Sequence, residues 1–258
     1  PAYDQIVQGV SGIMAITGDD ASGPLRVGYP VADTVGGLTA AFAISAALVA
    51  RPRGAFIDVS MLESVLSTMG WAVSNFLIAG LEPHRQGNEN VTSAPSGAFE
   101  TSSGLLNIAA NKDEQWHALA RSLGREDLLA DPDYATREDR KRNRMALKAE
   151  LETVLRNRPA QEWADVLNSA GVPAGAVLSV PEVLSDRQVA ERGFIFEFEN
   201  VPQIDRPISL ATGGARLNGE RSCPMGPPPA LGADGDAIWA ELGISEAEIA
   251  ELRSRGTL

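Results

Sequence analysis

The sequence is poor in the residues that several common site chemistries require. Its 258 residues include one cysteine, Cys223, so no disulfide can form within the chain and a reducing, cytoplasmic setting is expected. A single cysteine in a proline-rich segment is more often incidental than a nucleophile. Two histidines, His84 and His117, are too few for a zinc cluster where cysteine is so scarce. We therefore expect no metal and no permanently bound cofactor.

Basic residues are in the minority. The chain has 22 Lys and Arg against 34 Asp and Glu, which gives a formal net charge of −12. Nucleic acids and anionic membranes both bind basic surfaces, so we expect neither as a partner. A small anionic ligand remains compatible, because local basic or backbone sites can hold one in an acidic protein. No signal peptide is visible, and the opening on Pro1 fits a processed start or a fragment.

Hydrophobic residues make up 44% of the chain and are spread along it, which excludes global disorder. Residues 30–50 are the least polar stretch and have the length of a membrane span. They include an aspartate, which is costly inside a span, and are richest in weakly apolar alanine. We interpret this stretch as a buried helix that begins near Asp33, a residue type favoured as an N-cap. Gly36 and Gly37 leave its first turns bare, so that a backbone or a ligand can approach closely.

The remaining pattern predicts an α/β chain without repeats. A polar linker rich in glycine, proline and asparagine covers residues 82–98 and predicts a boundary. The run 137–144 mixes both charge signs and predicts a solvated helix face. Helices are expected over residues 3–17, 61–80, 112–123, 136–158, 159–171, 181–193 and 246–256, strands over 54–60, 172–180 and 194–201, an extended segment over 223–231, and a hairpin around 102–104.

Asp33 is the ionisable group set in a small, apolar, glycine-bearing segment. A carboxylate there can act as a base or a nucleophile. The plainer interpretation is a helix N-cap, worth about 1 kcal/mol. The two are compatible, because a helix N-terminus favours the ionised carboxylate. In the linker, Gly87 and Asn88 can form an anion-binding nest of backbone N–H groups, or an ordinary turn.

Several blocks carry a resemblance to a known family. They include PAYDQIVQGVSGIMAITG, PVADTVGGLTAAFAISAAL, GAFIDVSMLESVLS and GVPAGAVLS, and the ordered set covers almost the whole chain. The sequence resembles the class III coenzyme A transferases. The resemblance implies an interlocked-dimer α/β fold, with part of a Rossmann-like large domain and a smaller α+β domain. It places residues 1–85 and 190–258 in the large domain and 86–189 in the small one, and implies that an N-terminal Rossmann-like half is lacking.

The resemblance also implies a mechanism and a site. Asp33 would carry the acyl group and then CoA, as an aspartyl-CoA thioester. CoA or an acyl-CoA would be a substrate, with small carboxylic acids such as dicarboxylates as the other substrate. The loop 87–95 corresponds to one that closes over the site. Contacts to substrate or CoA are implied for Tyr3, Asp4, Gly36, Gly87 and Asn88.

Two alternatives stay open. The α-methylacyl-CoA racemases of the same superfamily pair their aspartate with a histidine, where this chain has Tyr3, thirty residues before Asp33. A phenol, with a pKa of about 10, is poorly suited to proton shuttling at neutral pH, so transfer is favoured. The other alternative is a non-catalytic subunit. The expected assembly is an interlocked homodimer, or a hetero-assembly with a chain that carries the N-terminal half.

Overall fold

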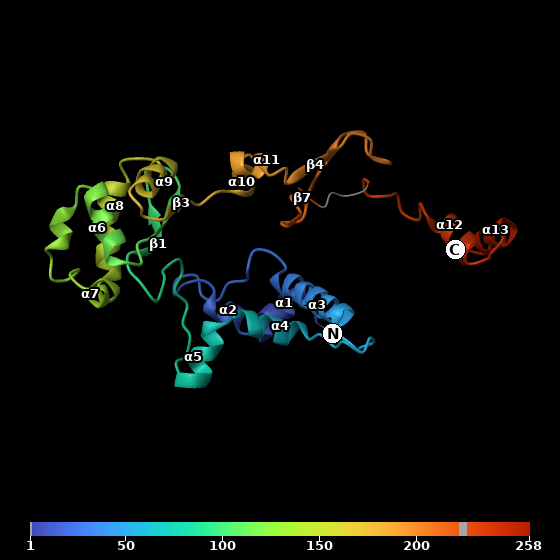
Figure 1. Cartoon of the computed structure of the whole chain (residues 1–258), viewed down its shortest axis with the longest axis horizontal. Helices are drawn as coiled ribbons and strands as arrows, with labels where there is room; N and C mark the ends of the chain where they lie inside the picture. Colours follow the sequence, from blue (N-terminus) through green and yellow to red (C-terminus); the bar gives the residue numbers. More distant parts are fainter. Residues whose placement is uncertain (1, 222–225) are drawn as a thin grey trace. The chain divides into compact units, whose positions relative to one another are not determined.

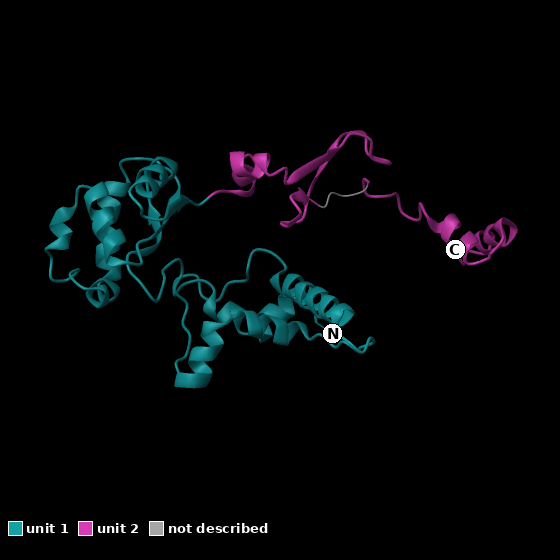
Figure 2. Cartoon of the chain, in the orientation of Figure 1, with its two compact units in different colours: residues 1–177 teal, residues 178–258 magenta. Residues whose placement is uncertain are grey.

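The computed structural model describes residues 2–221 and 226–258 and forms two compact units, residues 1–177 and 178–258 (Figure 2). Cys223 and part of the segment expected to be extended lie outside the described residues. Each unit has its own helices and antiparallel strands, so the expectation of an α/β chain is confirmed. The division into residues 1–85, 86–189 and 190–258 stays a prediction.

The first unit begins with a group of short helices around one long one (Figure 1). The helix expected over residues 3–17 is two helices, because Gly12 takes a left-handed φ of 82° that ends the first. The helix expected over 61–80 is also divided, at Gly70 with a φ of 51°. These elements are α1 (Asp4–Val10), α2 (Ile13–Ile16), α3 (Val31–Val49), α4 (Met61–Thr68) and α5 (Trp71–Ala79).

Helix α3 is packed on one side only. Its inner residue Ala32 forms a small core with Val7 of α1 and Val65 of α4. Gly36 allows a close approach between helices, because a Cβ atom there would lie 3.2 Å from Cγ of Met61. Both neighbours, α1 and α4, therefore pack against the face of α3 that carries Ala32 and Gly36.

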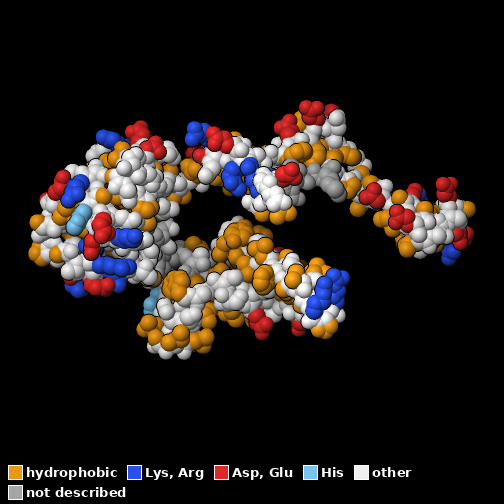
Figure 3. Space-filling view, viewed as in Figure 1, with side chains coloured by type: hydrophobic (Ala, Val, Ile, Leu, Met, Phe, Trp, Pro, Cys, Tyr) orange, Lys and Arg blue, Asp and Glu red, His pale blue; other side chains and the backbone are white. Residues whose placement is uncertain are grey.

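The expectation that α3 is buried is wrong for most of its surface. Only 17% of the most apolar window of α3 is buried within this chain. By length and composition alone, the helix could also cross a membrane. Phe42 is 77% exposed and Leu48 is 70% exposed. Helix α5 is similar, and its first residue, Trp71, is 60% exposed. Figure 3 shows hydrophobic side chains gathered over these helices, and no described element of the first unit covers them.

Residues 54–60 do not form the expected strand. They form no regular secondary structure, no described strand pairs with them, and Phe56 is 96% exposed. A strand needs a partner for its backbone N–H and C=O groups, so alternation in the sequence is not sufficient. The segment ends at Ser60, whose hydroxyl accepts a hydrogen bond from the Glu63 amide and caps α4.

The rest of the first unit is an α+β structure with the main core. The hairpin expected around residues 102–104 is confirmed, with Phe99 opposite Leu106 and a turn through Gly104. The third strand, β3, pairs antiparallel with β2, giving the order β1-β2-β3. Trp116 and Leu151 are among the side chains buried against this sheet. The elements are β1 (Ser96–Glu100), β2 (Leu105–Ala109), α6 (Asp113–Ser122), η1 (Glu126–Leu129), α7 (Arg137–Arg142), α8 (Arg144–Leu155), α9 (Ala160–Ser169) and β3 (Ala174–Ala176).

The second unit contains short helices and two-stranded sheets. Its expected strand is confirmed as β4, which pairs antiparallel with β5 and places the Phe196 and Phe198 rings 5.0 Å apart. The terminal helix is confirmed as α13 and begins with a capping box formed by Ser245 and Glu248. The elements are α10 (Val180–Leu184), α11 (Arg187–Glu191), β4 (Ile195–Phe198), β5 (Ile208–Ala211), β6 (Arg216–Leu217), β7 (Glu220–Arg221), α12 (Gly235–Glu241) and α13 (Glu246–Ser254).

Candidate active site

Asp33 lies in the first turn of α3 and is exposed to solvent. It is the third residue of the helix, and the residue at the N-cap position is Pro30, so the interpretation of Asp33 as an N-cap is wrong. The positive end of the helix dipole favours a carboxylate in the first turn. Asp33 therefore presents an accessible carboxyl group from a helix end, a placement that a nucleophile requires.

Asp4 caps the helix that carries Asp33. Its Oδ1 accepts a hydrogen bond from the Ala32 amide at 2.8 Å, and its Oδ2 accepts one from Nε2 of Gln8 at 2.7 Å. Partial burial raises the pKa of Asp4, but the bonds from Gln8 and from the Ala32 and Asp33 amides, together with the positive charge of Arg26, lower it below its usual value. Asp4 is thus held as a partly exposed carboxylate between α1 and the start of α3.

Gln8 is the site residue that the sequence did not reveal. Its side chain is fully buried, donates to Asp4, and accepts a hydrogen bond from the Val27 amide at 2.9 Å. Nε2 also lies 3.4 Å from the carbonyl oxygen of Tyr29. Gln8 therefore fixes the segment that leads into α3. The available signal was its spacing, because residues four apart on a helix share a face and an amide can pair with a carboxylate.

Tyr3 stands at the start of α1, next to the residue that caps α3. It occupies the N-cap position of α1, and its carbonyl oxygen accepts the Val7 amide at 3.1 Å. Its side chain is 82% exposed. The bond from Ala32 to Asp4 joins the residue before Asp33 to the residue after Tyr3, so the backbones that carry the two side chains are linked by one hydrogen bond.

Gly36 and Gly87, two other predicted ligand contacts, have structural roles within this chain. Gly36 is buried against Met61, so its observed role is helix packing. The Gly87 amide donates to the carbonyl oxygen of Gly18 at 2.8 Å, and Gly87 has a φ of 55°, so its N–H group is not available for an anion nest. The structure favours the ordinary turn for Gly87 and Asn88, and their contacts to CoA stay a prediction.

Gly87 lines a hollow beside α5. The hollow has a volume of about 380 Å³, and its walls include Trp71, His84 and Glu89. Neither Tyr3 nor Asp33 belongs to its lining. In the part of the chain that the structure describes, no group of three or more His, Cys, Asp or Glu side chains is placed to hold a metal ion.

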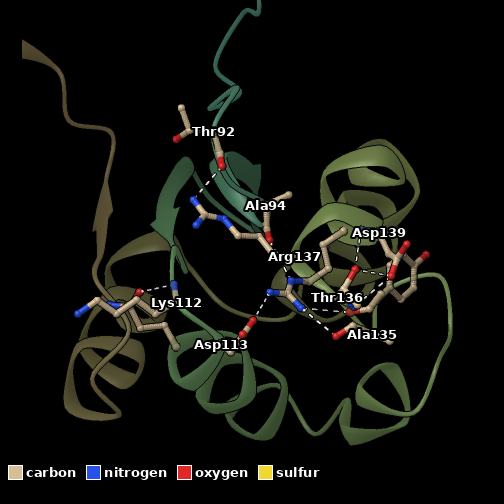
Figure 4. Close-up of polar contacts among 11 residues, drawn as sticks. Thr92, Ala94, Lys112, Asp113, Ala135, Thr136, Arg137 and Asp139 are labelled. Atoms are coloured by element: carbon tan, nitrogen blue, oxygen red, sulfur yellow. Dashed lines mark hydrogen bonds and ion pairs between the residues drawn. The ribbon is translucent and has the colours of Figure 1, made fainter.

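Basic side chains of α7 and α8 hold the linker that follows Gly87. Arg137 donates to the carbonyl oxygen of Thr92 at 2.9 Å (Figure 4), and Arg144 donates to that of Asn90 at 2.7 Å. Lys148 pairs with the carboxylate of Glu89 at 2.7 Å. Spacings of three and four residues place such side chains on one helix face. The solvated face expected over 137–144 is therefore only partly observed: Glu138 and Arg142 are exposed, whereas Arg144 contacts backbone carbonyls of the linker.

Arg140 is the buried member of this face, with 2% of its side chain exposed. It donates to the carbonyl oxygen of Ala94 at 3.2 Å and to the Asp113 carboxylate at 2.6 Å, and its guanidinium lies 5.5 Å from the Trp116 ring centroid. The nearby Ser93 hydroxyl is buried without a hydrogen-bond partner among the described residues. Arg140 thus fastens the end of the linker to α6 and to the core.

The arrangement of helices and small sheets matches solved structures with the class III CoA-transferase fold. A crystal structure of a CaiB/BaiF family protein from Brucella suis aligns over 93% of this chain with a TM-score of 0.80 and 31% identity. The model of CoA-transferase family III matches residues 1–235. The chain belongs to CoA-transferase family III, and the resemblance seen in its sequence is confirmed.

Curated relatives include CoA-transferases with named substrates. The acetyl-CoA:oxalate CoA-transferase of Acetobacter aceti is 37% identical over 82% of this chain and 55% of its own length. The succinyl-CoA:glutarate CoA-transferase of Mus musculus is 31% identical over 99% of this chain and 59% of its own length. This chain therefore spans less than two thirds of the length of these relatives, and 63% of the Brucella suis protein.

Proposed function

We propose that this chain is the part of a CoA-transferase that carries the catalytic carboxylate, and that the enzyme moves CoA from an acyl-CoA to a small dicarboxylic acid. The observation that carries the proposal is Asp33, an exposed carboxylate in the first turn of α3 whose backbone is fixed by Asp4. The names of the Acetobacter aceti and Mus musculus relatives, with oxalate and glutarate as acceptors, support the dicarboxylate class.

The proposed reaction uses Asp33 twice. Its carboxylate attacks the thioester carbon of the donor, the carbon–sulfur bond breaks, and a mixed anhydride and CoA thiolate result. The thiolate attacks the Asp33 carbonyl carbon, which releases the donor acid as a carboxylate and leaves an aspartyl-CoA thioester. The acceptor carboxylate repeats the exchange in reverse, so that CoA leaves on the acceptor and Asp33 is again a carboxylate. No step consumes water, so the thioester energy is retained.

The scaffold around Asp33 suits this chemistry. A nucleophile must stay in place while one bulky group replaces another, and a fixed backbone keeps that position at no cost during reaction. The Asp4 carboxylate and the buried Gln8 supply this fixation from within the chain. Both act as positioning residues, because neither is proposed to touch the reacting atoms. Tyr3, whose side chain is exposed and whose neighbour Asp4 caps α3, is proposed to donate its phenolic hydrogen to a substrate carboxylate.

Assembly is part of the proposal. The exposed apolar faces of α3 and α5 require a covering polypeptide, since patches of this kind mark interfaces in soluble proteins. We propose that this cover comes from the interlocked homodimer, or from a separate chain, in a cytoplasmic assembly. The native mass of the purified full-length protein tests this. A stable monomer with these faces still exposed to solvent would contradict the proposal.

Activity is tested by incubating the full-length protein with succinyl-CoA and a panel of acids, and by identifying new CoA esters by mass spectrometry. Asp33→Asn should reduce transfer by several orders of magnitude, because an amide is a poor nucleophile. Asp165→Asn, which changes an exposed carboxylate on α9, is the matched control and should leave transfer unchanged. Comparable transfer by the wild type and by Asp33→Asn would exclude the mechanism.

An isotope experiment separates the aspartyl-CoA route from direct transfer. When an acceptor labelled with oxygen-18 in its carboxylate reacts with aspartyl-CoA, the bridging oxygen of the second anhydride remains on Asp33. The peptide that contains Asp33 should therefore carry one heavy oxygen after a single turnover and approach two after many, because each donor half-reaction passes one Asp33 oxygen to the donor acid; peptide mass spectrometry measures this gain. An unlabelled Asp33 after many turnovers would show that the carboxylate is not a covalent carrier.

A further inference from the structure

We propose that Arg26 binds the second carboxylate of the dicarboxylic substrate and so determines acceptor specificity. This inference rests on the proposed function, because it assigns a substrate-recognition role at the Asp33 site. A dicarboxylate has one carboxylate that reacts and one that does not. The second must be recognised by a cation or by hydrogen-bond donors if the site is to prefer dicarboxylic over monocarboxylic acids.

Arg26 is attached to the same polar network that positions Asp33. The amide of Val27, the next residue, donates to Gln8, and Gln8 donates to Asp4. Asp4 in turn accepts the Ala32 amide at the start of α3. The backbone beside Arg26 is thus connected to the backbone beside Asp33 through two side chains. Such a fixed attachment limits the entropy that a long arginine side chain loses when it binds an anion.

The guanidinium of Arg26 is available. The residue is exposed, and its side chain makes one long hydrogen bond, from Nε to the Val27 carbonyl oxygen at 3.4 Å. Its two terminal nitrogens have no hydrogen-bond partner among the described residues. Those nitrogens present the planar pair of N–H donors that matches a carboxylate in a bidentate fork.

The other arginines of residues 2–85 either lie far from the start of α3 or already have partners. Arg51 and Arg53 follow the far end of α3, whose 19 residues extend about 28 Å from its first turn. Arg85 donates to the carbonyl oxygens of Asp19 and Ala15 and pairs with a carboxylate. Within this helical group, Arg26 is therefore the arginine that remains free near the start of α3.

The charges near the start of α3 also favour Arg26 as the group that binds the second carboxylate. The start of α3 carries two carboxylates, those of Asp4 and Asp33, which repel an incoming dianion. Arg26 lies close enough to Asp4 for its charge to act on that carboxylate. A dicarboxylate bound between Asp33 and Arg26 would face a cation at the end that does not react, which offsets the repulsion.

The test compares two acceptors of equal chain length, glutarate and pentanoate, in which a methyl group replaces the second carboxylate. Initial rates with saturating succinyl-CoA give kcat/KM for each acid, with pentanoate measured as a competitive inhibitor where its turnover is too slow. The ratio of the two values cancels the donor half-reaction, since both acids meet the same enzyme form. The variants are Arg26→Gln, Arg26→Lys, and Arg53→Gln as a control with the same loss of charge.

Arg26→Gln should lower the glutarate-to-pentanoate ratio at least about tenfold, mainly through KM, as expected for a lost charge-assisted bond. Arg26→Lys should retain part of the preference, and Arg53→Gln all of it. An equal loss for both acids, or no loss, would overturn the assignment to Arg26. Failure of the wild type to transfer CoA to any acid would instead contradict the proposed function, so the two failures are distinguishable.

Discussion

The Asp4 carboxylate accepts a hydrogen bond from the Ala32 amide at 2.8 Å, across 28 positions of the sequence. This contact joins the start of α1 to the start of α3 and sets the backbone on which Asp33 is presented. It also occupies a backbone donor at the N-terminus of α3, a position that commonly binds anions. The aspartate predicted as a ligand contact is thus the cap, and the one predicted as the cap is the exposed carboxylate.

Replacing Asp4 with asparagine should reduce stability in a pH-dependent way. The pKa of Asp4 is lowered in the folded protein, so its ionised form stabilises the fold fully above the usual carboxyl pKa of about 3.8. That contribution is lost as the pH falls through the lowered pKa, because the unfolded chain binds the proton more readily. The stability difference between wild type and Asp4→Asn should therefore shrink below about pH 4.

Urea unfolding at several pH values measures this difference. Asp20→Asn changes a fully exposed carboxylate and serves as the control. At neutral pH, Asp4→Asn should also lower kcat more than it raises KM, because it displaces Asp33 without removing a substrate contact. A stability difference that stays constant from pH 7 to pH 3 would show that the charge of Asp4 is not involved.

The two glycines of α3 should respond differently to alanine. A Cβ atom on Gly37 would have no other atom within 4 Å, so Gly37→Ala should stabilise the helix by up to about 1 kcal/mol. A Cβ on Gly36 would lie 3.2 Å from Cγ of Met61, so the same gain is offset by displacement of α4. Thermal unfolding should rank Gly37→Ala above wild type and above Gly36→Ala. The reverse order would contradict the observed packing of α3 on α4.

Arg144 should control how firmly the linker is held. Removing its bond to the Asn90 carbonyl, at 2.7 Å, leaves that backbone without a charge-assisted donor. Arg144→Gln should therefore speed hydrogen exchange of the amides in residues 89–94 by roughly tenfold, a cost near 1.4 kcal/mol. Arg142→Gln is the control, since Arg142 is 70% exposed and pairs only with Asp139 three residues before it. Equal exchange in both variants would exclude Arg144 as an anchor.

The sequence predicted the elements whose residues are close along the chain. The hairpin closed at Gly104, the strand β4 with its alternating phenylalanines and the helix α13 with its capping box are local patterns, and each is observed. The family blocks also predicted Asp33 as the catalytic carboxylate, and that role stays a prediction. Breaks at Gly12 and Gly70 were missed, because glycine is tolerated inside a helix and its φ is decided by what packs around it.

Contacts between distant segments were decided by the tertiary structure alone. Three hydrogen bonds show this. The Val27 amide donates to the buried Gln8, the Ala32 amide donates to Asp4, and Arg144 donates to the Asn90 carbonyl oxygen. Each bond joins residues far apart in the sequence, which no helix or strand periodicity relates. A polar side chain forms a buried hydrogen bond only when the fold brings a donor or acceptor within about 3 Å of it. The sequence by itself therefore singled out Asp33 as the candidate nucleophile, and the packing of α1 against α3 decided how that residue is presented.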